Sequence, residues 1–140
     1  MQYMKNELSL NKAYGEFVLG VSVDDYLQKR HTKLIYEEKT YTNECYVFED
    51  DGIEVWCNDG VINTIRCEIN CFYNGFNLIG MKYDDFLSYF QWQPSSEDVI
   101  YLLNNGRGQN QHVYEFGEEG LQIWVWRKKI RTILIYSAQV

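Results

Sequence analysis

The sequence of 140 residues contains one proline, two histidines and no long hydrophobic run. No segment approaches the roughly 20 consecutive apolar residues that a membrane-spanning helix needs. The opening residues, 1–7, contain no apolar stretch of the signal-peptide type. We therefore expect a cytoplasmic protein that does not act at a membrane.

The four cysteines lack the paired C-x-x-C spacing of a zinc ribbon. They are Cys45, Cys57, Cys67 and Cys71, all in the first half of the chain. In a cytoplasmic protein we expect reduced thiols that pack as small apolar side chains. A metal site or a disulfide remains the alternative, with Cys67 and Cys71 as the closest pair in the sequence.

Motifs of known catalytic sites are also missing from the sequence, including nucleophile-elbow, zinc-protease, Walker and Rossmann patterns. His31 and His112 both lie in polar stretches, where we expect a surface role. The acidic pairs Asp24–Asp25 and Asp84–Asp85 are adjacent residues, which do not face each other on a helix. We interpret these pairs as helix N-termini, where negative charge is favourable. The sequence therefore predicts no catalytic residue, no metal and no cofactor, with an uncharacterised hydrolase as the least favoured alternative.

The composition provides ample material for a core, because 46% of the residues are hydrophobic and 16% are aromatic. Two stretches of the chain also resemble each other. Residues 17–27 match residues 76–87, which aligns Gly20 with Gly80 at an offset of 60. We interpret this similarity as an internal duplication.

A second matched block supports the duplication at a different offset. Residues 48–56 match residues 116–124, which aligns Trp56 with Trp124 at an offset of 68. The change of offset places an eight-residue insertion between the matched blocks of the second copy. This region holds Pro94 and the stretch 104–108, and we expect a flexible loop there.

Each copy has the pattern of a helix followed by an antiparallel meander of three or four strands. Ser22 can cap a helix over residues 23–30, with residues 83–90 as the counterpart in the second copy. Apolar residues alternate with polar or aromatic ones over residues 53–57 and 121–126, as in half-buried strands. We predict an α+β fold in which helices cover one face of an antiparallel sheet and leave the other face for a partner.

The expected units are residues 1–75, with an N-terminal extension, and residues 76–140, within one compact globule. The triplet 58–60, Asn-Asp-Gly, predicts a hairpin turn, and the dipeptide 127–128, Arg-Lys, makes the corresponding turn in the second copy. After the first turn we expect a strand over residues 61–69. Its buried face would carry Val61, Ile65, Cys67 and Ile69.

Negative charge is concentrated in the first copy. Residues 1–75 hold 7 Lys and Arg against 13 Asp and Glu, whereas residues 76–140 hold 6 against 7. The excess gathers at Glu49, Asp50, Asp51, Glu54 and Asp59. These residues form either a solubilising rim or a surface for a basic protein partner. An acidic chain is a poor direct ligand for nucleic acid, and we expect the short basic stretch 127–131 to be ordinary surface.

Trp56, Trp124 and Trp126 share one strand face with Glu54 and Gln122. Tryptophan is a frequent anchor of protein interfaces, because it offers a large rigid contact area and one polar group. We expect these residues to bind a partner. The alternative is that the helices cover this face and bury the three rings.

A small acidic chain rich in Tyr and Trp, with one proline and no catalytic motif, resembles the immunity proteins of bacterial polymorphic toxin systems, such as contact-dependent growth inhibition. Residues 19–26 and 79–86 are similar to the helix opening of the tandem units in the group of β-lactamase-inhibitor proteins and outer-membrane-assembly lipoproteins. The lipobox cysteine of those lipoproteins is absent. Both resemblances imply proteins that act by binding other proteins.

The first resemblance implies an immunity protein that covers the active site or substrate-binding surface of a cognate toxin. The negative charge favours a basic toxin domain, and a nuclease in particular. The alternative is a duplicated module without enzymatic activity that binds a small ligand or assists protein assembly.

Overall fold

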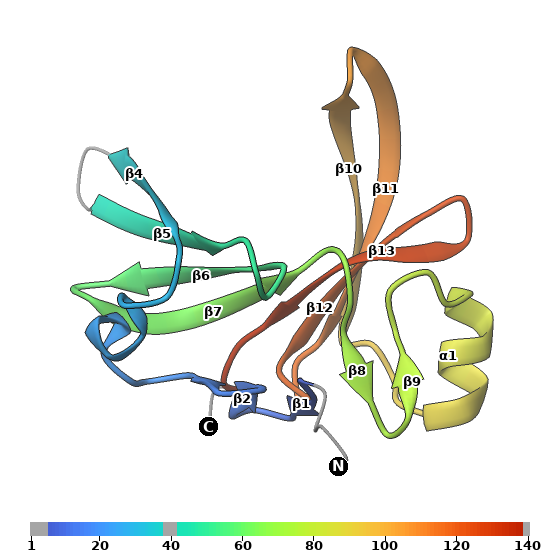
Figure 1. Ribbon diagram of the computed structural model, residues 1–140. Helices are drawn as coiled ribbons and strands as arrows, with labels where there is room; N and C mark the ends of the chain where they lie inside the picture. The colour runs from blue at the N-terminus through green and yellow to red at the C-terminus, as the bar shows by residue number, and fades with distance from the viewer. Residues whose placement is uncertain (1–5, 38–41, 139–140) are drawn as a thin grey trace.

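The computed structural model describes residues 6–37 and 42–138. One antiparallel sheet of eight strands dominates it, in the order β10-β11-β12-β13-β7-β6-β5-β4 (Figure 1). The described residues contain one α-helix, α1 (Tyr83–Phe90), and one short 3-10 helix, η1 (Val23–Tyr26). The protein is therefore mostly β, and the α+β class predicted from the sequence is wrong.

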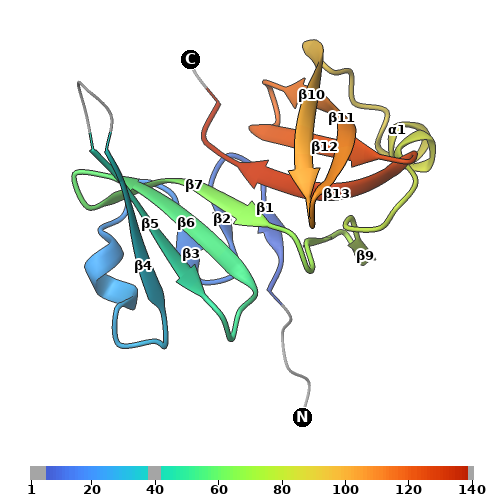
Figure 2. The same ribbon diagram turned by 90° about the horizontal axis from the view of Figure 1, so that it is seen from above.

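Each half of the sheet is a four-stranded meander. The first consists of β4 (Thr32–Glu37), β5 (Thr42–Phe48), β6 (Ile53–Asn58) and β7 (Val61–Cys67). The second consists of β10 (Ser96–Asn104), β11 (Arg107–Phe116), β12 (Leu121–Trp126) and β13 (Lys129–Ile135). The halves join where β13 pairs with β7, with Ile133 opposite Cys67 and Ile135 opposite Ile65. Figure 2 shows the two meanders side by side.

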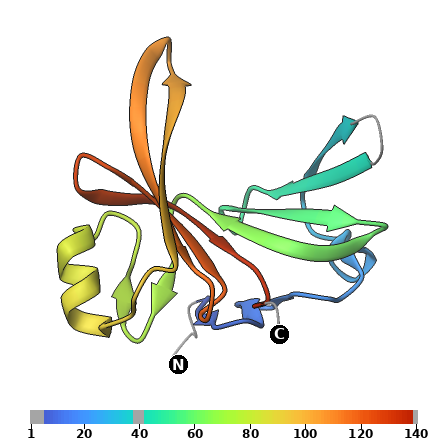
Figure 3. The same cartoon turned by 180° about the vertical axis from the view of Figure 1, so that it is seen from behind.

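Short elements pack beneath this sheet (Figures 1 and 3). They are η1, α1, the three-stranded sheet of β1 (Leu8–Ser9), β2 (Ala13–Tyr14) and β3 (Phe17–Val18), and the hairpin of β8 (Phe72–Tyr73) and β9 (Phe76–Asn77). Their apolar side chains and those of β6, β7, β12 and β13 form one buried cluster, to which Phe17, Leu78 and Phe86 belong. The core thus lies on one side of the sheet.

The helix of the first half is shorter than predicted for a reason visible in its sequence. In α1 the apolar residues Tyr83, Phe86, Leu87 and Phe90 follow the i, i+3, i+4, i+7 spacing of a helix face. The first half keeps the first three positions but has Arg30 at the fourth. With too little apolar surface for two turns, only the 3-10 helix η1 forms, capped by the Ser22 hydroxyl, which accepts from the Asp24 N–H at 3.2 Å.

Contacts recur between the halves at the two offsets seen in the sequence. The Gly20 N–H donates to the Ile62 carbonyl at 2.8 Å, and the Gly80 N–H donates to the Ile130 carbonyl at 2.8 Å. Likewise, the Val23 N–H donates to the Gly60 carbonyl at 2.8 Å, and the Tyr83 N–H donates to the Lys128 carbonyl at 2.9 Å. These bonds attach η1 and α1 to equivalent hairpin turns.

A β-bulge interrupts the β6–β7 hairpin. Trp56 lies opposite Thr64, but the next residue, Cys57, lies opposite Ile62, so Asn63 is an extra residue in β7. Such a bulge places the extra residue and its neighbour on the same face of the sheet. The β12–β13 hairpin has the same irregularity, with Arg131 as its extra residue.

The bulge also corrects the predicted face of β7. The buried residues are Ile62, Ile65 and Cys67, whereas Val61 is 40% exposed and Ile69, beyond the end of the strand, is 64% exposed. Strict alternation from Val61 fails because the extra residue shifts the pattern by one position.

The predicted insertion is not a flexible loop. Pro94 precedes β10, and residues 104–108 end β10, form a turn and begin β11; the two strands form a long hairpin that rises from the sheet (Figure 1). Asn105 and Gly106 make its turn with φ values of 53° and 78°, the left-handed pair of a type I′ turn. The added residues therefore lengthen a hairpin.

Candidate functional site

A hollow of about 920 Å³ lies on the face of the sheet opposite the core. Trp56, Trp124 and Trp126 line it, together with Leu102 and Leu103 from β10. Its remaining lining residues come from β7 and the residue that follows it, from β11 and from β13. They are Asn63, Thr64, Arg66, Glu68, Gln109, Gln111, Arg131, Thr132 and Leu134. We call this site the concave hollow.

Strand alternation places the tryptophans there. On β6, Ile53, Val55 and Cys57 are buried in the core, so Trp56 points to the other face. Trp124 and Trp126 alternate in the same way with the buried residues of β12. All three rings are partly buried and lie outside the core cluster. The alternative in which helices cover this face is therefore wrong.

The two β-bulges add further side chains to the hollow. Asn63 and Thr64 line it in the first half, and Arg131 and Thr132 line it at the equivalent positions of the second half. The two ends differ in charge, because a neutral amide in one bulge corresponds to a guanidinium in the other. This difference makes the β12–β13 end of the hollow positive.

Trp124 is held by a chain of hydrogen bonds. Its indole N–H donates to Gln122 Oε1 at 2.7 Å, and the Gln122 amide donates to Glu115. The Tyr136 hydroxyl donates to the other Glu115 oxygen at 2.6 Å. Burial, and then the bond to Glu115, raises the pKa of Tyr136, which stays protonated and keeps donating at neutral pH. This network fixes the orientation of the Trp124 ring.

The hollow contains two arginines in different environments. Arg66 is neutralised by Glu54, at 3.2 Å, and by Glu68. Arg131 forms no ion pair with any residue in the part of the chain that the structure describes. Its guanidinium carbon lies 5.5 Å from the centre of the Trp126 ring, and that of Arg127 lies 4.4 Å from the same ring.

The predicted acidic residues lie in three places. Glu49, Asp50 and Asp51 lie in the β5–β6 turn. Glu54 forms an ion pair with Arg66, which lines the hollow. Asp59 is exposed in the β6–β7 turn. The structure therefore does not join all of them with the tryptophans into one surface.

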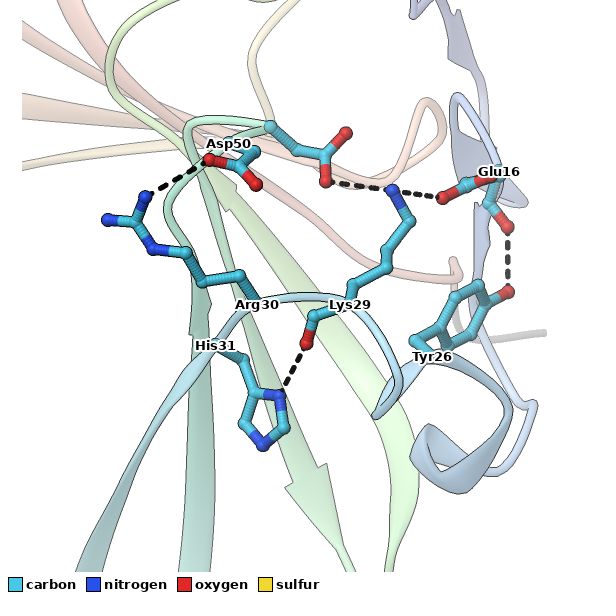
Figure 4. A network of polar contacts seen from close by, with 7 residues as sticks. Glu16, Tyr26, Lys29, Arg30, His31 and Asp50 are labelled. Carbon is cyan, nitrogen blue, oxygen red and sulfur yellow. Dashed lines mark hydrogen bonds and ion pairs between the residues drawn. The ribbon is translucent and has the colours of Figure 1, made fainter.

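Two neighbouring cations partly offset the negative charge of the β5–β6 turn (Figure 4). Lys29 Nζ lies 3.1 Å from Asp51 Oδ2 and 2.7 Å from Glu16 Oε1, and Arg30 Nη1 lies 3.4 Å from Asp50 Oδ1. The Thr32 hydroxyl donates to Glu49 and is the main reason that the pKa of Glu49 is lowered. These contacts weaken the negative potential that the sequence suggested for this turn.

Two kinds of lining residue were not anticipated from the sequence. Leu102, Leu103, Gln109 and Gln111 come from the hairpin expected to be a loop, and Arg131 comes from the stretch expected to be ordinary surface. The alternation in Gln109-Asn-Gln-His-Val was the available signal for a strand. This signal was weak because the first two buried positions, Gln109 and Gln111, carry amides instead of apolar side chains.

The histidines lie away from the hollow and from each other. His31 Nδ1 is 2.8 Å from the Lys29 carbonyl, and His112 Nδ1 is 3.3 Å from Glu97 Oε2. Within residues 6–37 and 42–138, no group of three or more His, Cys, Asp or Glu side chains could hold a metal. No helix of those residues is long and apolar enough to cross a membrane.

Comparison with protein-family models, curated proteins and solved structures finds no match. The hollow itself is therefore the basis for inferring a function. The hollow offers an aromatic surface, apolar side chains at one wall and, at one end, a cation that forms no ion pair within the described part of the chain.

Proposed function

We propose that the protein is an immunity protein, which binds a cognate bacterial protein toxin in the concave hollow and covers its active site or substrate-binding surface. One observation carries the proposal. Trp56, Trp124 and Trp126 all line one hollow on the face of the sheet that the core leaves open. Tryptophans held half-buried by a rigid scaffold are the residues that dominate binding energy at protein interfaces.

The surroundings of the tryptophans favour a protein partner. Leu102 and Leu103 supply an apolar wall, and Leu103 is 72% exposed in the free protein. Covering such side chains removes apolar surface from water. The β10–β11 hairpin rises from the sheet (Figure 1), and the hollow between this hairpin and the sheet suits a protruding loop of a partner.

The net charge of −7 favours a basic toxin domain, and a nuclease is the first class to test. The cytoplasm is the compartment in which such an immunity protein meets its toxin. Four free and buried cysteines suit this reducing compartment.

A second candidate function is binding of a small ligand in the same hollow. The volume of about 920 Å³ favours it, because ligand sites occupy about 300–1,000 Å³. A small ligand would be bound by the isolated protein and would raise its melting temperature without any protein partner.

The decisive experiment co-expresses this protein with the toxic domain encoded beside its gene and measures growth and co-purification. We expect protection and a one-to-one complex. Trp124→Ala and Trp126→Ala should each reduce protection. Tyr89→Ala is the matched control, because Tyr89 is 55% exposed on α1, outside the hollow.

Two outcomes would contradict the proposal. In the first, the toxin is neither bound nor neutralised by the wild-type protein. In the second, protection persists in the double variant Trp124→Ala, Trp126→Ala, which would move the interface away from the hollow.

A further inference from the structure

The described cations divide into paired and unpaired groups. Lys29, Arg30, Lys33 and Arg66 each form an ion pair with a carboxylate. Among the described residues, no ion pair is formed by Lys12, Lys82 or Arg107, nor by the four cations of the β12–β13 hairpin. These four are Arg127, Lys128, Lys129 and Arg131. In a chain of net charge −7, four cations without an ion pair thus belong to one hairpin. Of these, Arg131 lines the concave hollow, and Arg127 lies over the ring of Trp126, which also lines it.

Buried polar atoms without partners occur at the same end. Arg131 Nε is buried and has no hydrogen-bond partner among the described residues, and the same is true of Gln111 Oε1. Gln111 is only 7% exposed, and its side chain lines the hollow. A buried donor or acceptor without a partner lowers the stability of the free protein. A ligand with polar groups can relieve this cost.

The turn that carries two of the cations is conformationally unfavourable. Arg127 and Lys128 have φ values of 51° and 68°, where side chains other than Gly, Asn and Asp are disfavoured. The equivalent turn of the first half is Asp59-Gly60, which suits the same geometry. Two long cations therefore occupy a turn whose backbone favours other residues, and one of them lies over Trp126.

We infer that the Arg131 end of the concave hollow binds an acidic segment of the protein partner, in which a carboxylate side chain lies next to an aromatic or apolar one. The carboxylate pairs with the Arg131 guanidinium, and the neighbouring side chain packs against Trp124 and Trp126. A guanidinium with no competing anion is suited to a carboxylate. This inference rests on the proposed function, and it is compatible with a partner that is basic overall.

Charge complementarity selects a peptide over a nucleic acid. The hollow also contains Glu68, and Glu54 lies beside it on Arg66. These carboxylates and the overall negative charge repel a polyphosphate chain. A single carboxylate side chain can bind through an ion pair with Arg131 alone.

The test uses three peptides of one length with acetylated and amidated ends: Gly-Asp-Phe-Asp-Gly, its Asn counterpart and its Lys counterpart. Each is titrated into the ¹⁵N-labelled protein while the indole N–H signals of the four tryptophans are followed by NMR. The acidic peptide should shift the signals of Trp124 and Trp126. Trp92, which packs in the aromatic cluster of α1, should stay unchanged.

Arg131→Gln should weaken binding of the acidic peptide by about tenfold, as expected when one partner of a charge-assisted hydrogen bond is removed. Arg107→Gln is the matched control. It removes the same charge from β11, at a residue that does not line the hollow. Binding of the acidic peptide should also weaken with added NaCl.

Several outcomes would overturn the inference. The first two are that the Asn or Lys peptide binds as tightly as the acidic peptide or more tightly, and that Arg131→Gln binds the acidic peptide with unchanged affinity. The next is that none of the three peptides shifts the indole signals. The last two are that N-acetylphenylalanine alone binds as tightly as the acidic peptide, and that a dT10 oligonucleotide binds in the hollow more tightly than that peptide. The proposed function is judged separately by toxin protection. Protection that requires Trp124 but tolerates Arg131→Gln would retain the immunity function and reject the acidic segment.

Discussion

Lys128 occupies the turn position in the second meander that Gly60 occupies in the first. Their φ values, 68° and 76°, both lie in the left-handed region. Each carbonyl accepts the N–H of the first residue of a short helix, Lys128 from Tyr83 and Gly60 from Val23. The backbone geometry is therefore shared, but only one of the two residues suits it.

Replacing Arg127-Lys128 by Asn-Gly should stabilise the protein. Asn and Gly are the preferred residues of a type I′ turn, and the change should raise the free energy of unfolding by about 1–2 kcal/mol. Urea unfolding followed by circular dichroism measures it. The same variant loses the Arg127 guanidinium over Trp126 and should bind the acidic peptide less tightly. A variant that is less stable than the wild type would show that the cations support the fold.

The local parts of this fold could be predicted from the sequence. Alternation indicated the strands around Ile53–Cys57 and Leu121–Trp126, and the helix Tyr83–Phe90 lies where the match to the Ser22-capped segment placed it. Alternation and a capping residue both depend on residues within a few positions of each other, so a sequence alone can reveal them.

The class of the fold and most of the site could not be predicted. Their origin is non-local, as in the pairing of Ile133 with Cys67, 66 residues apart in the chain. The β10 strand leaves Val99, Tyr101 and Leu103 exposed, so its apolar residues do not mark a buried side. Nothing in the basic stretch 127–131 indicated that a β-bulge would place the Arg131 side chain in the hollow.

Gly120→Ala should destabilise the protein more than Gly80→Ala. Both residues have positive φ, 70° and 88°, so both variants carry backbone strain of about 1–2 kcal/mol. A Cβ at Gly120 would also collide with the backbone carbonyl oxygen of Tyr136 and the side chain of Asn11, whereas nothing lies within 4 Å at Gly80. Urea unfolding of both variants tests this, and equal losses would contradict the steric argument.

Stability should decline at alkaline pH because of buried thiols. Burial raises the pKa of Cys45 to about 12 and that of Cys57 to about 11. A folded pKa above the unfolded value means that the stabilisation is complete below about pH 8.5, the ordinary thiol pKa, and is lost as pH rises toward the folded values.

We therefore expect the urea midpoint to fall between pH 8 and pH 11. It should fall less steeply in the double variant Cys45→Ala, Cys57→Ala, although that variant starts from a lower stability because it leaves two small cavities. The buried Tyr14, whose pKa burial also raises, contributes in the same direction and remains in the variant. Identical pH dependence of the two proteins would exclude the thiols as a cause.

Truncating a tryptophan of the hollow should separate binding from stability. Trp124 is half-buried on the open face and lies outside the core cluster, whereas Phe116 is fully buried and packs against Phe86 at a centroid distance of 5.6 Å. Phe116→Ala should cost about 3–5 kcal/mol of unfolding free energy. Trp124→Ala should cost less, because its ring lies on the open face of the sheet, outside the core cluster.

The two substitutions should have the opposite order of effect on dissociation of the complex, with the larger effect from Trp124→Ala. Trp124→Ala should accelerate dissociation of the toxin domain at least tenfold, as for a central anchor residue, while any folded fraction of Phe116→Ala should dissociate at the wild-type rate. Surface plasmon resonance with the purified toxin domain measures both rates. If Trp124→Ala instead unfolds the protein as readily as Phe116→Ala, the ring belongs to the structural framework, and the binding energy must come from Trp126 and the leucines of β10.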